Sequence, residues 1–134
     1  MDLKQAKELV RSRLSDKRYE HTINVKKMAV KLAKHYGTDP EQAALAALLH
    51  DCDDYKLAGE EAAEKLPNAR RILTMAGADD DMREKVLNIV ARMGYSKSLK
   101  GIRPSSLEGK VVSDADMLDA IGVGGIIRCL QYAV

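Results

Sequence analysis

The segment "PEQAALAALLHD" (residues 40–51) constrains the fold more than any other part of the chain. Apolar side chains would lie on nearly every side of a helix formed by this segment, so other elements must cover it all round. Thr38 or Asp39 can cap the helix, and Pro40 suits its first turn. We therefore expect this helix to lie at the centre of the domain.

Helical periodicity extends over most of the remaining chain. Apolar residues from Val25 to Tyr36 recur at i, i+3, i+4, i+7 and i+11, which indicates one face of a long helix that ends at Gly37. The preceding "SDKRYEHT" is predicted to be a turn. Other helices are expected over residues 2–14, 60–66, 69–75, 80–93 and, in one or two pieces, 107–134.

The alternating pattern of a half-buried strand is missing. No segment alternates convincingly between apolar and polar residues, and the chain contains no Phe or Trp, two residues that are enriched in strands. Aliphatic residues and six Met must then fill the core, which suits close packing of helices. The predicted fold class is all-α.

Length, charge and cysteine content narrow the classes of function. The 134 residues suit a single domain over residues 1–134, although the apolar helical pattern at Val134 leaves open a domain that is short or truncated there. A net charge of +2 argues against nucleic acid and membrane surfaces as partners, and no apolar run reaches the roughly 18 residues of a membrane span. Two lone cysteines and the absence of a signal core favour the cytoplasm. Nothing indicates the oligomeric state.

The central helix ends in an unusual group of polar residues, "HDCDD". His50 closes the most apolar helix, where a neutral imidazole needs a defined partner. Asp51 places a carboxylate directly beside it, and further aspartates follow. Two explanations are open: an acidic loop that simply follows the helix, or a metal ion gripped by the His-Asp pair.

Two other segments contain residues that favour a metal site. His21 lies one turn before Val25 on the inward face of another helix, although a lone histidine there is more often a core or edge residue. "VVSDADMLDAIG" places Asp114, Asp116 and Asp119 in a segment that otherwise suits the core, where carboxylates need partners. An acidic turn or helix start would also accommodate them. Two imidazoles and two carboxylates suit Mn, Fe, Zn, Co or Ni.

In chain order, these residues resemble a known pattern. His21, then His50 with Asp51, then an aspartate in "DADMLDA" resemble the H…HD…D pattern of the HD superfamily of metal-dependent phosphohydrolases. "RYEHTINVKKMAVKLAKHYGTDPEQAALAALLHD" is similar to the start of bacterial HD hydrolases that cleave symmetrical dinucleoside tetraphosphates. "EGKVVSDADMLDAIGVGGIIR" is similar to small HD proteins that act on nucleoside triphosphates.

The resemblance implies a compact HD-domain bundle of about 6–7 helices with one divalent ion (Mn, Fe, Co, Ni, Zn or Mg) between them. It implies His21, His50, Asp51 and Asp116 as the ligands. Helical spacing alone leaves Asp114 open as the alternative to Asp116.

The chain departs from both branches of the superfamily. It has no histidine after His50, whereas the first branch carries additional histidines that hold a second metal. Met93 and Gly94 stand where the second branch usually has a His-Ser pair. Both departures indicate a single-metal or reduced site and leave the substrate open. Asp114 and Asp119 are candidates to support the ligands from behind.

The predicted activity is hydrolysis of a phosphoester or phosphoanhydride bond of a nucleotide by metal-activated water. Asp54 follows His50 by four residues and is the candidate general base; a solvated loop acid explains it equally well. Arg18 and Lys56 are the candidate cations for substrate phosphates.

Two other functions compete with this prediction. The first is a non-catalytic sensor that binds a nucleotide or metal with the same fold, which the missing histidines and the apolar C-terminus motivate. The second is a structural helical domain in which the pattern of histidines and aspartates is coincidental. Bound metal distinguishes the structural domain from the other two functions, and turnover distinguishes the enzyme from the sensor.

Overall fold

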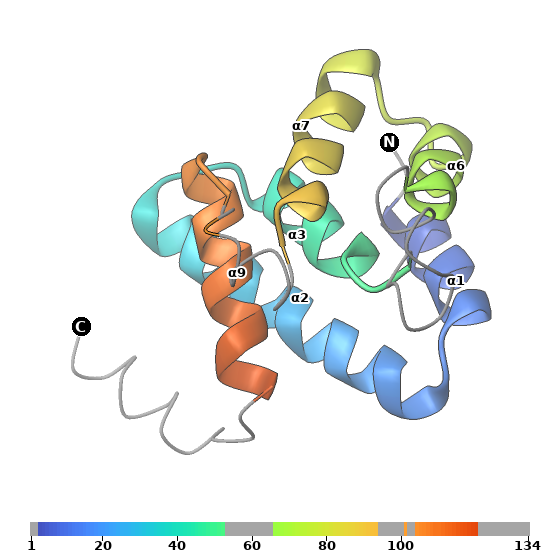
Figure 1. Cartoon of the computed structure of the whole chain (residues 1–134), viewed down its shortest axis with the longest axis horizontal. Helices are drawn as coiled ribbons and strands as arrows, with labels where there is room; N and C mark the ends of the chain where they lie inside the picture. The colour runs from blue at the N-terminus through green and yellow to red at the C-terminus, as the bar shows by residue number, and fades with distance from the viewer. Residues whose placement is uncertain (1–2, 53–65, 94–100, 102–103, 121–134) are drawn as a thin grey trace.

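The computed structural model describes residues 3–52, 66–93, 101 and 104–120. Within these ranges the chain forms helices and no strand (Figure 1): α1 (Leu3–Arg13), α2 (Asp16–Tyr36), α3 (Pro40–Leu49), α6 (Pro67–Met75), α7 (Asp80–Ala91) and α9 (Leu107–Ala120). The prediction of an all-α fold is confirmed. None of these helices combines the length and the apolar character needed to cross a bilayer.

Helix α3 is the centre of the domain, as its sequence predicts. Every side chain from Gln42 to Leu49 is buried, and α3 packs against α1, α2, α7 and α9. Burial of one leucine side chain stabilises a fold by about 1.5–3 kcal/mol, so the apolar surface of α3 contributes strongly to stability. Asp39 caps the helix by accepting hydrogen bonds from two backbone N–H groups, and Pro40 opens it.

The ends of α2 agree with the prediction only in part. Ser15 accepts a hydrogen bond from the N–H of Arg18, so α2 begins at Asp16. Most of "SDKRYEHT" is therefore helical, and the predicted turn is wrong. Gly37 ends α2 as expected, with a φ of 71°. Tyr36 is 54% exposed, so the buried face of α2 does not reach it.

The later helices follow the predicted order. Pro67, expected to separate two helices, is the first residue of α6, and Asp79 caps α7 by accepting a hydrogen bond from the N–H of Met82. Residues 60–65 of the helix expected at 60–66, most of the loop after α7 and the end of the last segment lie outside the described residues. Leu66 lies just before α6 with a φ of 51° and is not helical.

The helices form two groups around α3. Helices α2 and α9 contact each other and both contact α3, whereas α6 contacts α1 and α7 (Figure 1). Helix α9 therefore brings a segment from late in the chain against α2 and α3. The predicted ligands lie within this group.

Helix α9 packs closely against its neighbours at Gly109. A Cβ at this position would lie 2.5 Å from Pro104 Cβ and 3.3 Å from Ile89 Cγ1 of α7. We expect Gly109→Ala to destabilise the domain by about 1–3 kcal/mol through overpacking, in spite of the higher helix propensity of alanine. Thermal unfolding measures the change, with Lys110→Ala at an exposed position of α9 as the control. An unchanged or higher Tm would contradict the close approach.

Candidate metal centre

Three segments that are distant in sequence meet at one point of the α2–α3–α9 group. Helix α2 carries His21, the end of α3 carries His50 and Asp51, and α9 carries Asp116. Ligand atoms of His21, His50 and Asp51 all lie within 4.8 Å of one another. We call these four residues the candidate metal centre.

His21 is held on both ring nitrogens by carboxylates of α9. Its Nδ1 lies 2.5 Å from Asp119 Oδ2, and its Nε2 lies 3.0 Å from Asp116 Oδ1. The histidine side chain is 20% exposed, so the ring is mostly shielded from solvent. The two carboxylates thus fix the orientation of the ring across the contact between α2 and α9.

His50 is oriented by the backbone instead. Its Nδ1 donates a hydrogen bond to the carbonyl of Ala47 at 2.5 Å, one of the last carbonyls of α3, which have no partner within the helix. Its Nε2 then faces Asp116 Oδ1 at 3.1 Å and Asp51 Oδ2 at 3.4 Å. The pattern of side chains in the sequence does not predict this contact, because the acceptor at Ala47 belongs to the backbone.

The centre contains buried polar atoms that suit a cation. Among the described residues, His50 Nε2 and Asp51 Oδ2 are buried and have no hydrogen-bond partner of proper geometry. Buried polar atoms are almost always satisfied. Both atoms face the point where His21 Nε2 and Asp116 also converge, and two imidazoles with two carboxylates form a donor set for Zn, Mn, Fe, Co or Ni. The residues therefore fit a divalent ion.

The charges of the centre favour protons when no metal is bound. Burial lowers the pKa of His50, but the Asp116 and Asp51 carboxylates and the Ala47 carbonyl outweigh it and raise this pKa to about 9. Burial would raise the pKa of the Asp116 carboxyl, yet His50 and His21 hold it below its usual value. In the metal-free protein the His50 imidazolium therefore faces the carboxylates of Asp51 and Asp116, the groups that would also bind the metal ion.

The remaining predicted residues differ in their distance from the centre. Arg18 lies at its edge, with Nη1 3.9 Å from Asp51 Oδ2 and a side chain that is 39% exposed. Asp114 is exposed on α9, so of the two candidate aspartates it is Asp116 that lies between the histidines. Asp54 and Lys56 lie outside the described residues, and their roles stay predictions.

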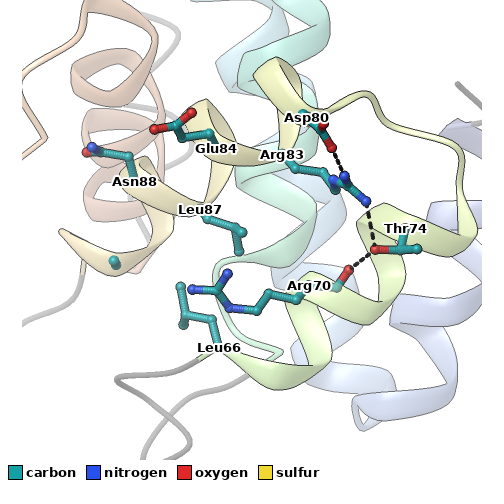
Figure 2. Close-up of a pocket in the computed structure, with 9 residues that line it drawn as sticks. Leu66, Arg70, Thr74, Asp80, Arg83, Glu84, Leu87 and Asn88 are labelled. Carbon is teal, nitrogen blue, oxygen red and sulfur yellow. Dashed lines mark hydrogen bonds and ion pairs between the residues drawn. The ribbon is translucent and has the colours of Figure 1, made fainter.

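A groove of about 610 Å³ lies elsewhere, between α6 and α7, and Figure 2 draws the side chains that line it. Arg83 donates a hydrogen bond to Thr74 at 3.2 Å and pairs with Asp80, and the Thr74 hydroxyl donates to the carbonyl of Arg70. The hydrogen bond from Arg83 to Thr74 joins the two helices across the groove, and the other two contacts lie within α7 and α6. None of the residues predicted for function lines it.

Comparison with known proteins identifies relatives with the same domain. The model of the HD domain family matches residues 18–121. The uncharacterized protein YpgQ of Bacillus subtilis is 34% identical over an alignment that covers 98% of this chain and 68% of YpgQ. A symmetrical bis(5'-nucleosyl)-tetraphosphatase of Halalkalibacterium halodurans is 47% identical over 38% of this chain and 27% of that enzyme.

Solved structures agree with these matches. The crystal structure of Bacillus subtilis YpgQ superposes with a TM-score of 0.74 at 32% identity, over 99% of this chain and 69% of that one. The structure of YpgQ in complex with ADP gives 0.67 at 31% identity, over 98% and 66%. A predicted HD superfamily hydrolase from an uncultured Thermotogales bacterium gives 0.71 at 31% identity, over 97% and 75%.

The raised pKa of His50 predicts how the stability of the metal-free protein depends on pH. The folded-state pKa exceeds the ordinary value of 6.5, so the stabilisation is complete below about 6.5 and is lost as pH rises through about 9. Asp116, which faces His50, remains ionised in this window because the two histidines hold its pKa below its usual value. We expect the Tm measured in EDTA to fall over this interval and the fall to shrink in His50→Gln. A Tm that is equally flat in both proteins would contradict the charged pair.

Proposed function

This chain belongs to the HD domain family, and we propose that it is a metal-dependent phosphohydrolase that acts on a nucleotide. One observation carries the proposal: the convergence of His21, His50 and Asp51, with buried atoms of His50 and Asp51 that lack partners among the described residues. A domain with only a structural role has no need of such a convergence, because unsatisfied buried polar groups cost stability.

The proposal assigns each side chain of the centre a task. Nε2 of His21, Nε2 of His50 and carboxylate oxygens of Asp51 and Asp116 would hold one divalent ion. When bound, the ion supplies Lewis-acid chemistry, which polarises a phosphoryl oxygen and makes water a better nucleophile near neutral pH. The Ala47 carbonyl accepts a hydrogen bond from Nδ1 of His50 and so keeps the proton on that nitrogen. Nε2 would then be the ring nitrogen that binds the metal ion.

Arg18 is the described cation best placed for a substrate phosphate. It lies on α2 one turn before His21, and its guanidinium reaches the edge of the centre at Asp51. A guanidinium binds phosphate oxygens through two parallel N–H groups. Asp54 as general base and Lys56 as a second cation belong to the same proposal, from residues outside the described ranges.

The relatives support a nucleotide as the substrate class. One structure of YpgQ is a complex with ADP, and the tetraphosphatase of Halalkalibacterium halodurans carries a nucleotide substrate in its name. This chain spans about two-thirds of YpgQ and 27% of the tetraphosphatase. We propose residues 1–134 as one HD domain with one ion from the set Mn, Fe, Co, Ni, Zn and Mg.

A panel of nucleoside mono-, di- and triphosphates and dinucleoside tetraphosphates, with each divalent metal in turn, tests the proposal. We expect release of phosphate or nucleotide, with kcat/KM at least about 100-fold lower in Asp51→Ala. Substitution of a residue that only supports a metal ligand already lowers activity about 10- to 100-fold, and Asp51 is a proposed ligand itself. Glu108→Gln is the control, because it removes a carboxylate from the start of α9.

The same panel separates the competing functions. If the protein binds metal but shows no turnover above the Asp51→Ala background, the result favours a non-catalytic sensor over an enzyme. The absence of any histidine after His50 is the reason to consider the sensor. If elemental analysis finds no metal in either the wild-type protein or a variant without His50, the purely structural helical domain is the function that remains.

Arg18→Ala tests the proposed phosphate contact separately. Its side chain is 39% exposed and is not a proposed metal ligand, so metal content should stay at the wild-type level. We expect KM for the nucleotide to rise about 10-fold, the effect of losing about 1.4 kcal/mol of binding. An unchanged KM with a lowered metal content would instead assign Arg18 to the support of Asp51.

A further inference from the structure

We propose that Asp119 is a positioning residue that sets the metal affinity of the centre by holding His21 with Nε2 toward the cation. The inference rests on the proposed function, because it assumes that His21 is a ligand. The carrying observation is the contact of His21 Nδ1 with Asp119 Oδ2 at 2.5 Å.

The contact joins two helices whose residues are 98 positions apart. The Asp119 side chain is 29% exposed and the His21 side chain 20% exposed, so water competes for this hydrogen bond less than at an open surface. Asp119 lies three residues after Asp116 on α9. One helix therefore presents one carboxylate to each nitrogen of the same ring.

The two nitrogens of His21 are not equivalent because their partners differ in position. An ionised carboxylate can only accept a hydrogen bond, so Asp119 keeps the proton on Nδ1. Without a metal ion, Nε2 likewise donates to Asp116 Oδ1. A cation bound at the centre would replace that proton on Nε2, while Asp119 would keep the proton on Nδ1. Loss of Asp119 frees the ring to rotate or to exchange tautomers, and either change removes Nε2 from the centre.

His50 provides an internal comparison. Its ring is oriented by the Ala47 carbonyl, which the backbone of α3 fixes, and its side chain is only 4% exposed. His21 is oriented instead by side chains of another helix, and the partner of its Nδ1 is the Asp119 carboxylate. A substitution at Asp119 therefore weakens one imidazole ligand and leaves the other in place. A carboxylate behind a ligating histidine also increases the basicity of the ring.

Titration of the metal-free protein with Co²⁺, followed by its visible absorption, tests the inference without any substrate. We expect Asp119→Ala to weaken Co²⁺ binding by about 10- to 100-fold and to shift the absorption bands as the ligand geometry changes. Asp119→Asn keeps an acceptor oxygen without the charge, so its affinity should lie between those of wild type and Asp119→Ala. Glu108→Gln should bind like wild type.

A double-mutant cycle shows whether Asp119 acts through His21. In a His21→Ala background the imidazole is already absent, so Asp119→Ala should cause little further loss of Co²⁺ affinity. Equal losses in both backgrounds would overturn the proposal. Thermal unfolding in EDTA checks the fold, and the nearly isosteric Asp119→Asn carries the test if Asp119→Ala does not fold.

The outcomes distinguish this inference from the function on which it rests. Wild-type affinity and spectrum in both Asp119 variants would overturn the positioning role and leave the metal centre intact. A wild-type protein that binds no Co²⁺, Mn²⁺ or Zn²⁺ would overturn the proposed function and this inference together.

Discussion

The structure depends on how the end of α3 is buried. This helix is apolar all round and is covered by other helices. The polar residues at its end, His50 and Asp51, are therefore buried with it. Their Nε2 and Oδ2 atoms have no hydrogen-bond partner of proper geometry among the described residues. Burial of such atoms is costly, and a proton or a divalent cation shared with Asp116 offsets that cost.

The other helices then have distinct tasks. Helices α2 and α9 complete the centre by bringing His21 and Asp116 to the end of α3, and the close approach at Gly109 seats α9. Helices α6 and α7 cover another part of the core and are tied to each other by Arg83 and Thr74 (Figure 2). The candidate chemistry therefore occupies one side of the bundle, and the rest of the described fold supports α3.

Features that depend on local sequence could be predicted. The central helix, with its cap at Thr38 or Asp39, and the end of α2 at Gly37 follow from short-range rules, and the ordered histidines and aspartates indicated the HD family. Features that depend on packing could not. The choice between Asp114 and Asp116 depends on how α9 is rotated against α2, which helical spacing does not determine, and the Ala47 carbonyl is invisible in a pattern of side chains.

The most direct test is a crystal structure of the protein grown with Co²⁺ or Mn²⁺, with the ion located by its anomalous scattering. The account predicts one ion about 2.0–2.3 Å from Nε2 of both His21 and His50, with oxygens of Asp51 and Asp116 completing the protein ligands. An ion bound at another place, or bound here while His21 points to solvent, would contradict it.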